Sequence, residues 1–552
     1  MNRLNLKWVT ETIGEEYKKW KKGDIVTIQA QTGTGKTYFI KNKLIPFMDY
    51  YEHMLIVANR INLKRQLKKD LLTNMREEIP KDIKELDSRT QFGSVKIMSY
   101  QQIDEALNAK SFGSNNFNLD YYDYIVLDEC HYILCDSGFN NKTDYSFNEL
   151  IRNNHNNAVK IFISATMEEV IRPIEKTFKD INSNGFGVCK NKLWNYTTGT
   201  DYSYLNHYYF KCIDDIALTI KNADKVEGKW LVFVTKKADA DKIVEIIDKS
   251  KTTTIITKDT NNNDDLDEII NNSKFKSDVL ICTKCLDNGI NIVDKNVKNI
   301  VVMAWDRITF IQELGRIRQD IENPYMMNLY IQTRSKQSFQ TLIDRVYNPK
   351  LELIDEYEGA KDGILINNKM TEEDKLELYN DFCIKYNRSY SKLPKDIFYL
   401  DNEGKWKINF NGWVRLTEDR KFAEGMVEFF KLDKTFAFID VQLNWIGLNT
   451  NYDNLIEDVI DKNDTNKLVQ WLEEHKDERL FGEEQQELSN LIIKELTTIG
   501  NDIDYRTKKL KPMTIENILR VQLGLNYAIS KPKKESKGDN RGKRYITISE
   551  IK

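Results

Sequence analysis

Short runs of apolar and β-branched residues recur along the first 335 positions, with helical or polar stretches between them. Such runs are typical of parallel strands that are buried on both faces of an α/β sheet. The first set comprises DIVTIQA from residue 24, MLIVA from 54, VKIM from 95, YIVLD from 124 and KIFIS from 160. The second set comprises YYFKC from 208, WLVFV from 230, TTIIT from 253, VLICT from 279, NIVVMA from 299 and MNLYI from 327. The pattern therefore predicts two parallel-sheet domains.

A stretch rich in Gly, Asn and Tyr near residues 183–204 separates the two sets, and we interpret it as an inter-domain connection. Beyond residue 350 the short apolar runs give way to longer amphipathic stretches such as TNKLVQWLEEHKDERL, which are typical of helices. We therefore expect an α/β fold with domains over residues 1–200 and 201–350. A mostly helical accessory region should follow over residues 351–552.

Composition adds limits on the class of protein. With 40% hydrophobic and 30% charged residues, the chain has the composition of a soluble globular protein. A membrane helix needs about 20 consecutive apolar residues, and the sequence shows no run of this length. The first residues lack the apolar core of a secretory signal. The seven cysteines are dispersed, and the one C-x-x-C, Cys282 with Cys285, has no second pair to complete a zinc site. We expect a cytoplasmic protein with no membrane contact.

Charge is uneven along the chain, although the total is only −3. Residues 1–350 carry a net +3, residues 351–500 a net −13 and residues 501–552 a net +7. The basic end, above all KPKKESKGDNRGKR at 531–544, favours contact with phosphate groups, and the acidic region is a candidate surface for a protein partner. An ordinary solvated surface is the competing interpretation.

The string AQTGTGKT follows a strand-like run and precedes a helix-compatible stretch, which is the context of a phosphate-binding loop. Glycines let backbone N–H groups turn toward phosphates, Lys36 places a cation on the β- and γ-phosphate oxygens, and Thr37 offers a hydroxyl to Mg²⁺. Ala30 stands where the strict form of this loop has its first glycine. The expected nucleotide-binding residues are Ala30, Gln31, Thr32, Gly33, Thr34, Gly35, Lys36 and Thr37.

The string LDECH ends a strand-like run about 90 residues further on, so its two carboxylates can reach the same nucleotide. Asp128 is expected to hold Mg²⁺, and Glu129 to orient and deprotonate the attacking water. An isolated Asp-Glu pair is usually a solvated turn, but the position after YIVL favours the catalytic interpretation.

Three further strings complete a resemblance to superfamily 2 helicases, in particular the DExH group, over roughly residues 20–335. They are SAT from Ser164, TKCLDNGINI from Thr283 and QELGRIRQ from Gln312, in the family's own order after the two strings above. Ala30 also agrees with the family's A-x-x-G-x-G-K-T loop. The resemblance implies two RecA-like domains that hydrolyse ATP with Mg²⁺ in the cleft between them.

The resemblance also implies roles for individual residues. His131, Ser164, Ala165 and Thr166 would link hydrolysis to strand movement, and Gly289 would contact the nucleotide. Gln312 and Arg316 would reach the γ-phosphate, where a guanidinium from a second domain neutralises charge and makes hydrolysis depend on domain closure. The family commonly has a second arginine three residues after the first, where this chain has Gln319. Arg318 is therefore an alternative arginine finger to Arg316.

Nucleic-acid contacts are expected in loops that follow the strands, because the family holds its strand mainly by the phosphates. The candidates are Asn59, Arg60, Ser99, Tyr100, Gln101, Thr235 and Thr283. For each of them an ordinary loop residue is the competing interpretation, and Tyr100 fits the core equally well. DNA is the favoured polymer and RNA the alternative.

The interval between Asn291 and Gln312 is too short for a long strand-splitting hairpin, so an unwinding wedge would have to come from the C-terminal region. Trp406, Trp413 and the run 531–544 are the candidates, and both tryptophans fit a core as well. Three functions remain open. The first is a translocating helicase, the second a nucleic-acid-stimulated ATPase that remodels or senses a substrate without unwinding, and the third a binding module with an inactive ATP site. Intact Lys36, Asp128 and Glu129 argue against the third.

Overall fold

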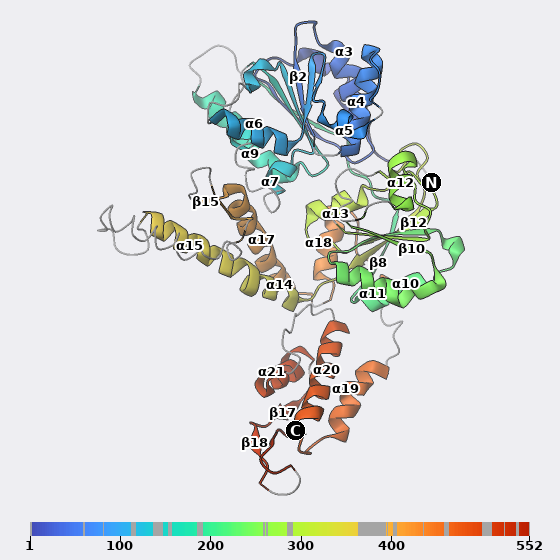
Figure 1. Cartoon of the computed structure of the whole chain (residues 1–552), viewed down its shortest axis with the longest axis vertical. Helices are drawn as coiled ribbons and strands as arrows, with labels where there is room; N and C mark the ends of the chain where they lie inside the picture. The colour runs from blue at the N-terminus through green and yellow to red at the C-terminus, as the bar shows by residue number, and fades with distance from the viewer. Residues whose placement is uncertain are drawn as a thin grey trace.

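Two α/β domains, a helical accessory region and a separate C-terminal unit make up the molecule (Figure 1). The computed structural model describes residues 3–58, 61–80, 82–111, 117–135, 147–152, 157–184, 191–257, 260, 263–283, 291–362, 394, 396–400, 406–433, 435–456, 463–498, 510–523, 525–536 and 540–550. The predicted α/β class with two parallel sheets is confirmed.

The first domain is built on a sheet in the order β3-β4-β2-β5-β6-β1-β7, parallel except for β3. Its strands are β1 (Ile25–Gln29), β2 (Met54–Val57), β3 (Gln91–Phe92), β4 (Val95–Met98), β5 (Tyr124–Asp128), β6 (Val159–Ser164) and β7 (Leu193–Thr197). Its helices are α1 (Val9–Ile13), α2 (Lys36–Phe39), α3 (Ile45–Phe47), α4 (Ile61–Met75), α5 (Ile83–Ser88), α6 (Tyr100–Ser111), α7 (Tyr132–Cys135) and α9 (Glu168–Asn184). The central strands are buried along their whole length because α4 covers one face and α6 and α9 cover the other.

The second domain has a sheet in the order β10-β11-β9-β12-β13-β8-β16, parallel throughout. Its strands are β8 (Leu205–Phe210), β9 (Lys229–Phe233), β10 (Thr253–Ile256), β11 (Val279–Cys282), β12 (Val297–Val302), β13 (Met327–Gln332) and β16 (Leu455–Ile456). Its helices are α10 (Ile213–Asn222), α11 (Lys237–Ile247), α12 (Asp264–Asn272) and α13 (Arg307–Leu314). The parallel order places the carboxyl ends of these strands at one edge, where loops that carry chemistry gather.

Two segments differ from the sequence-based expectation. Leu193–Thr197 lies inside the stretch interpreted as a connection, but it forms the edge strand β7 beside β1. Its side chains alternate between half-buried and exposed, so the segment lacks the continuous apolar run that marks a central strand. Leu455–Ile456 lies in the region expected to be accessory, but it forms the edge strand β16 of the second sheet, beside β8.

The accessory region packs against both domains. It contains α14 (Lys336–Leu342), α15 (Asn348–Asp362), β14 (Phe398–Leu400), β15 (Trp406–Ile408), α17 (Phe410–Phe429) and α18 (Ala437–Trp445). Helix α17 contacts α7 of the first domain, and α18 contacts α13 of the second. Trp406 is buried in this region's own apolar cluster and Trp413 packs against it, so the core interpretation holds for both tryptophans.

The C-terminal unit has an apolar cluster of its own, built around Leu472, Leu488, Ile492 and Leu519. It comprises α19 (Asn463–Glu474), α20 (Gly482–Thr498), α21 (Pro512–Asn517), β17 (Tyr527–Ile529), β18 (Lys533–Lys534), β19 (Arg544–Tyr545) and β20 (Ile548–Glu550). It lies at the end of the molecule opposite the first domain (Figure 1).

The N-terminal segment touches both α/β domains. The backbone N–H of Leu4 donates to the carbonyl of Ile321 in the second domain, over 2.9 Å. Three residues on, the N–H of Lys7 donates to the carbonyl of Thr198, again over 2.9 Å, and α1 follows against the first domain. The segment therefore joins the two domains by backbone hydrogen bonds.

Candidate active site

The phosphate-binding loop leaves β1 and turns directly into α2. Gly33 and Gly35 have φ values of +95° and +86°, a left-handed conformation that glycine adopts without a Cβ penalty. Ala30 is fully buried, and its N–H donates to the carbonyl of Ser164 on the neighbouring strand. Trp8 packs over the loop, since a Cβ on Gly35 would lie 3.3 Å from its ring. The loop is thus held in the shape that directs N–H groups toward an anion.

Glu129 follows the last residue of β5, and its backbone φ is +50°. Such a conformation is uncommon outside glycine and costs free energy, so it is typical of functional sites that the surrounding fold holds in place. The turn aims the carboxylate at the loop, where its Oε1 lies 2.8 Å from Lys36 Nζ. Both side chains are nearly enclosed, at 5% and 10% exposure, so this ion pair is little screened by water.

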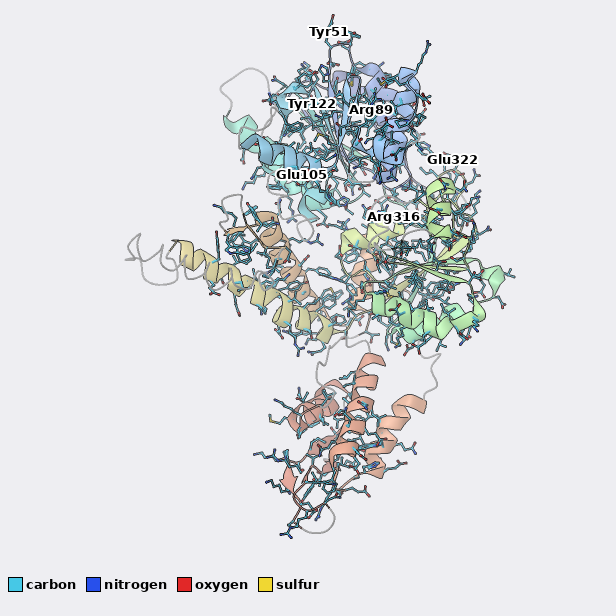
Figure 2. The ribbon with its side chains drawn as sticks, viewed as in Figure 1. Tyr51, Arg89, Glu105, Tyr122, Arg316 and Glu322 are labelled. Carbon is cyan, nitrogen blue, oxygen red and sulfur yellow. The ribbon has the colours of Figure 1, made fainter. Side chains whose placement is uncertain are left out.

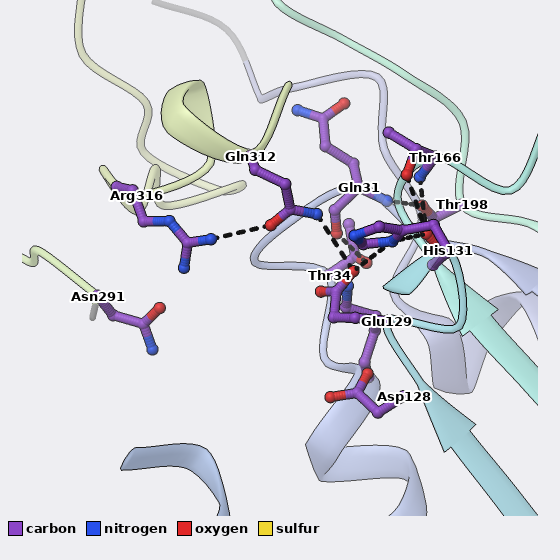
Figure 3. A network of polar contacts seen from close by, with 12 residues as sticks. Gln31, Thr34, Asp128, Glu129, His131, Thr166, Thr198, Asn291, Gln312 and Arg316 are labelled. Atoms are coloured by element: carbon purple, nitrogen blue, oxygen red, sulfur yellow. Dashed lines mark hydrogen bonds and ion pairs between the residues drawn. The ribbon is translucent and has the colours of Figure 1, made fainter. Parts of the chain in front are cut away.

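A second domain reaches the same carboxylate. Gln312, from α13, donates from Nε2 to Glu129 Oε2 over 3.3 Å, and Arg316 donates from Nη2 to Gln312 Oε1 over 2.9 Å (Figure 3). Arg316 is 1% exposed. A continuous chain of polar contacts therefore runs from Lys36 through Glu129 and Gln312 to Arg316.

Arg318 has a different partner. Its guanidinium donates from Nε and Nη2 to Oδ1 of Asn291, over 3.1 and 2.6 Å, within the second domain. Arg316, in contrast, is linked through Gln312 to the Glu129 carboxylate beside the phosphate-binding loop (Figure 3).

Gly315 lets the second domain approach the loop closely. A Cβ at this position would lie 2.6 Å from Thr32 Oγ1, closer than such contacts occur. Gln319 adds to this approach, because its carbonyl oxygen would be 3.8 Å from a Cβ on Gly33. The end of α13 and the phosphate-binding loop therefore form opposite walls of one narrow cleft.

The residues expected to couple hydrolysis to movement lie together beside this cleft. His131 Nδ1 is 2.8 Å from Ser164 Oγ and 3.5 Å from Glu129 Oε2. Ser164 Oγ also accepts a hydrogen bond from the N–H of Thr166, over 3.0 Å. Ala165 lines an adjoining cavity of about 360 Å³ between the two domains and α18.

The sequence analysis did not predict one group of ion pairs between the two domains. Arg307, the first residue of α13, pairs with Glu168 over 3.1 Å and with Glu169 over 3.6 Å. Gln29, at the end of β1, donates to the same Glu168 carboxylate over 2.6 Å. These contacts join the helix that carries Gln312 to the segment directly after the SAT string.

Burial keeps two neighbouring acids in their neutral form. It raises the pKa of the Cys130 thiol well above its usual range, with the Glu129 and Asp128 carboxylates adding to the effect. It likewise raises the pKa of the Tyr100 hydroxyl, to which the nearby Cys130, Asp128 and Glu129 contribute. Neither group can therefore replace Glu129 as a general base near neutral pH.

Magnesium would fit the donors at the base of the cleft. Thr37 offers a hydroxyl and Asp128, 5% exposed at the end of β5, offers carboxylate oxygens, both of which are hard ligands that this ion prefers. Among the residues that the structure describes, no group of three or more His, Cys, Asp or Glu side chains gathers as a metal cluster. Magnesium commonly takes only one or two protein carboxylates and completes its shell with phosphate and water.

The candidate nucleic-acid contacts are dispersed. Asn59 and Arg60 lie outside the described residues, as does Gly289, which was expected to contact the nucleotide. Tyr100 is 1% exposed and donates its hydroxyl to the carbonyl of Asp128, so it belongs to the core. Gln101 donates to the Tyr132 hydroxyl. The remaining candidates follow their strands as expected, with Ser99 before α6, Thr235 exposed after β9 and Thr283 after β11.

In the described part of the chain, no helix has both the length and the apolar character needed to cross a membrane.

Figure 2 shows the described side chains, with Arg316 on the second domain and Arg89 and Tyr122 on the first.

Comparison with known proteins places two family models on this site. Residues 5–169 match the model for the type III restriction enzyme, res subunit, and residues 210–319 match the helicase conserved C-terminal domain. The first match covers the phosphate-binding loop and Glu129, and the second ends at Gln319. A comparison with curated protein sequences gave no match.

Solved structures with a similar chain course include a DEAD box protein and the proteins Dbp5 and Mss116p. Dbp5 of S. cerevisiae, bound to RNA and ADP BeF3, is 17% identical, with 58% of this chain and 81% of that chain covered and a TM-score of 0.39. A DEAD box protein from Methanococcus jannaschii is 18% identical, with 59% and 85% covered and a TM-score of 0.33. Mss116p bound to ssRNA and AMP-PNP is 17% identical, with 71% and 84% covered and a TM-score of 0.42.

Proposed function

Because this chain belongs to helicase superfamily 2, with RecA-like domains in tandem, we propose that it is an ATP-dependent nucleic-acid translocase or helicase. The observation that carries this proposal is the contact chain from Lys36 through Glu129 and Gln312 to Arg316, which crosses from one domain to the other. Hydrolysis in such a site requires both domains, and that requirement is how a motor converts ATP turnover into movement.

The proposed reaction is attack of water on the γ-phosphorus of ATP. Triphosphate binding would replace Glu129 by phosphate oxygens as the partner of Lys36, since both anions compete for one ammonium group. The released Glu129 carboxylate would then take the proton of the attacking water as the bond to the new oxygen forms and the bond to ADP breaks. Magnesium at Thr37 and Asp128 would neutralise charge on the phosphates.

We assign the arginine finger to Arg316 rather than Arg318. Charge spreads over the γ-phosphate oxygens in the transition state, and a guanidinium from the second domain stabilises it. The contact of Arg316 with Gln312 supports this assignment, whereas the guanidinium of Arg318 is hydrogen-bonded to Asn291. We propose the predicted roles for three further groups of residues. Residues 30–37 bind the nucleotide, and His131 and residues 164–166 couple hydrolysis to movement. Ser99, Gln101, Thr235 and Thr283 contact the nucleic-acid strand.

A second candidate function is a nucleic-acid-stimulated ATPase that remodels or senses a substrate without unwinding. The interval between Asn291 and Gln312 favours it, because β12 and α13 take up most of that interval and leave no room for a strand-splitting hairpin. Four points stay predictions. They are DNA as the polymer, a cytoplasmic location, a protein partner on residues 351–500 and the domain boundaries at residues 200 and 350.

The test measures ATPase and strand displacement side by side. ATP hydrolysis is followed without polymer and with single-stranded DNA, duplex DNA or RNA, and tailed duplexes report displacement. Stimulation together with displacement supports the helicase, and stimulation alone supports the second candidate. Absence of ATP hydrolysis under every condition would overturn both.

A further inference from the structure

Cations lie opposite one another on a two-stranded ribbon in the C-terminal unit. Strand β18 pairs antiparallel with β19, in a register that sets Lys534 directly opposite Arg544. Like charges in this position repel each other and destabilise the ladder. Further exposed cations of the ribbon and its approach are Lys531, Lys533, Arg541 and Lys543. The fold thus holds positive charge together at a cost that an anionic partner would relieve.

The one acid of the described ribbon is paired with an arginine from outside the ribbon. Glu535 has a side chain that is only 9% exposed, and its carboxylate pairs with Arg479 from outside the ribbon. The same carboxylate accepts the N–H of Ser536 over 2.8 Å. Because Glu535 is engaged within the unit, the outward charge of the ribbon stays positive.

The ribbon is also held in a defined shape. Glu535 donates its N–H to the carbonyl of Lys543 over 3.0 Å, and Gly542 donates to the carbonyl of Glu535 over 2.8 Å. On the other side, Tyr545 packs against Phe481, with ring centroids 5.7 Å apart, and the Arg479 guanidinium lies 5.2 Å from the Tyr545 ring. A positioned array of cations binds a polyanion with less loss of conformational entropy than a mobile one.

We propose that this ribbon is a second nucleic-acid site, which binds the phosphate backbone of a duplex. Lysine and arginine neutralise backbone phosphates without reading sequence, and a two-stranded ribbon has the width that the major groove of B-DNA admits. Single strands are held largely by bases stacked on aromatic rings. Tyr545, the aromatic residue of β19, is packed against Phe481 and Arg479 instead. The inference rests on the nucleic-acid part of the proposed function but not on ATP hydrolysis.

The test compares two double variants of the full chain that remove equal charge from the same unit. Lys534→Ala with Arg544→Ala alters the ribbon. Lys511→Ala with Arg520→Ala, at exposed residues just before and just after α21, is the control. Affinity for a blunt DNA duplex, and for a single strand of equal length, is measured by fluorescence anisotropy over a series of salt concentrations. Each lost phosphate contact lowers the salt slope by about 0.9. We therefore expect the ribbon variant to lose about two units of slope and roughly tenfold in duplex affinity at moderate salt.

Folding and turnover are checked in the same samples. The ribbon variant should keep its basal ATPase and a thermal midpoint at least equal to that of the wild type, because one repulsive pair is gone. Lys534→Arg with Arg544→Lys should keep the duplex affinity. A salt slope equal to that of the control variant, or a greater loss on the single strand than on the duplex, would overturn the inference. Glu129→Gln should leave the slope unchanged, so failure of the ATPase proposal is distinguishable from failure of this one.

Discussion

Gln312 donates a hydrogen bond to the carboxylate of Glu129 across the domain boundary, over 3.3 Å and 183 positions of sequence. Glu129 is thereby shared between Lys36 of its own domain and a residue of the other. Both domains therefore contact the proposed general base, and we expect hydrolysis to depend on their closure.

Glu129→Gln should abolish turnover while ATP still binds. The amide cannot accept the proton of water, so we expect kcat to fall by about 10²- to 10⁴-fold. ATP affinity should be retained or rise, since Lys36 no longer pairs with a competing carboxylate. Equilibrium binding of a fluorescent ATP analogue and single-turnover hydrolysis measure the two effects. Turnover at the wild-type rate would refute the assignment of Glu129.

Arg316→Ala should lower kcat far more than Arg318→Ala. Arginine fingers contribute about 10³- to 10⁵-fold to phosphoryl transfer, so we expect a loss of this order for Arg316. Loss of Arg318 should act mainly by releasing Asn291, with a smaller effect. Steady-state ATPase at saturating ATP compares the two, and the reverse order of effects would move the finger to Arg318.

Arg307→Ala should weaken the coupling between nucleic acid and ATP. The ion pairs of Arg307 with Glu168 and Glu169 join the two domains away from the phosphate-binding loop, so basal ATP binding should change little. Coupling free energies are commonly a few kcal/mol, so we expect stimulation of ATPase by nucleic acid to fall by about tenfold. Arg345→Ala, which alters an exposed arginine in the helical turn Ile343–Tyr347 after α14, is the control. Equal stimulation in both variants would count against a coupling role for Arg307.

Lys160→Met should stabilise the first domain near neutral pH. Burial of Lys160, which is 1% exposed, lowers the pKa of its ammonium from 10.5 to about 8. Below pH 8 the folded state carries a charged, desolvated lysine, and this cost disappears as the pH rises from about 8 to about 10.5, where the unfolded state loses its proton as well. We expect the variant to gain up to about 3 kcal/mol at pH 7 and nearly nothing at pH 10.5.

Urea unfolding at both pH values tests this gain, with Lys221→Met, an exposed lysine, as the control. A gain for Lys160→Met that does not depend on pH would point to apolar packing and not to desolvation of charge.

Apolar and β-branched runs made all the central strands and the edge strand β10 predictable from the sequence, whereas the edge strands β3, β7 and β16 were missed. The eleven runs that we identified all form strands, because a strand covered on both faces needs an unbroken apolar run. Strands β3 and β16 have two residues each, and β7 is half exposed. Strand β3 pairs with the adjacent strand β4 but is too short to show a pattern. Strands β7 and β16 pair with β1 and β8, which lie far away in the sequence, so no local pattern reports their pairing.

The residues of the candidate site also divide into those that the sequence predicted and those that only the structure shows. Lys36, Asp128 and Glu129 lie at or after strand ends, in motifs from which their roles could be predicted. The structure brings Lys36 and Glu129 into contact. The Arg307 and Glu168 pair joins residues 139 positions apart and has no spacing rule, so only the folded chain reveals it. The part of the chain beyond residue 350 shows the same limit, since an amphipathic stretch predicted helix α19, but no pattern predicted that α17 would contact α7.

The short N-terminal segment limits how far the two α/β domains can separate. Its anchor to the second domain at Leu4 and its anchor to the first at Lys7 are three residues apart, and a fully extended chain spans at most about 3.3–3.6 Å per residue. The two anchor points can therefore part by no more than about 10 Å before one attachment breaks. A wider separation of the domains would have to break one of these two hydrogen bonds, so this segment limits how far the proposed ATP cycle could open the cleft.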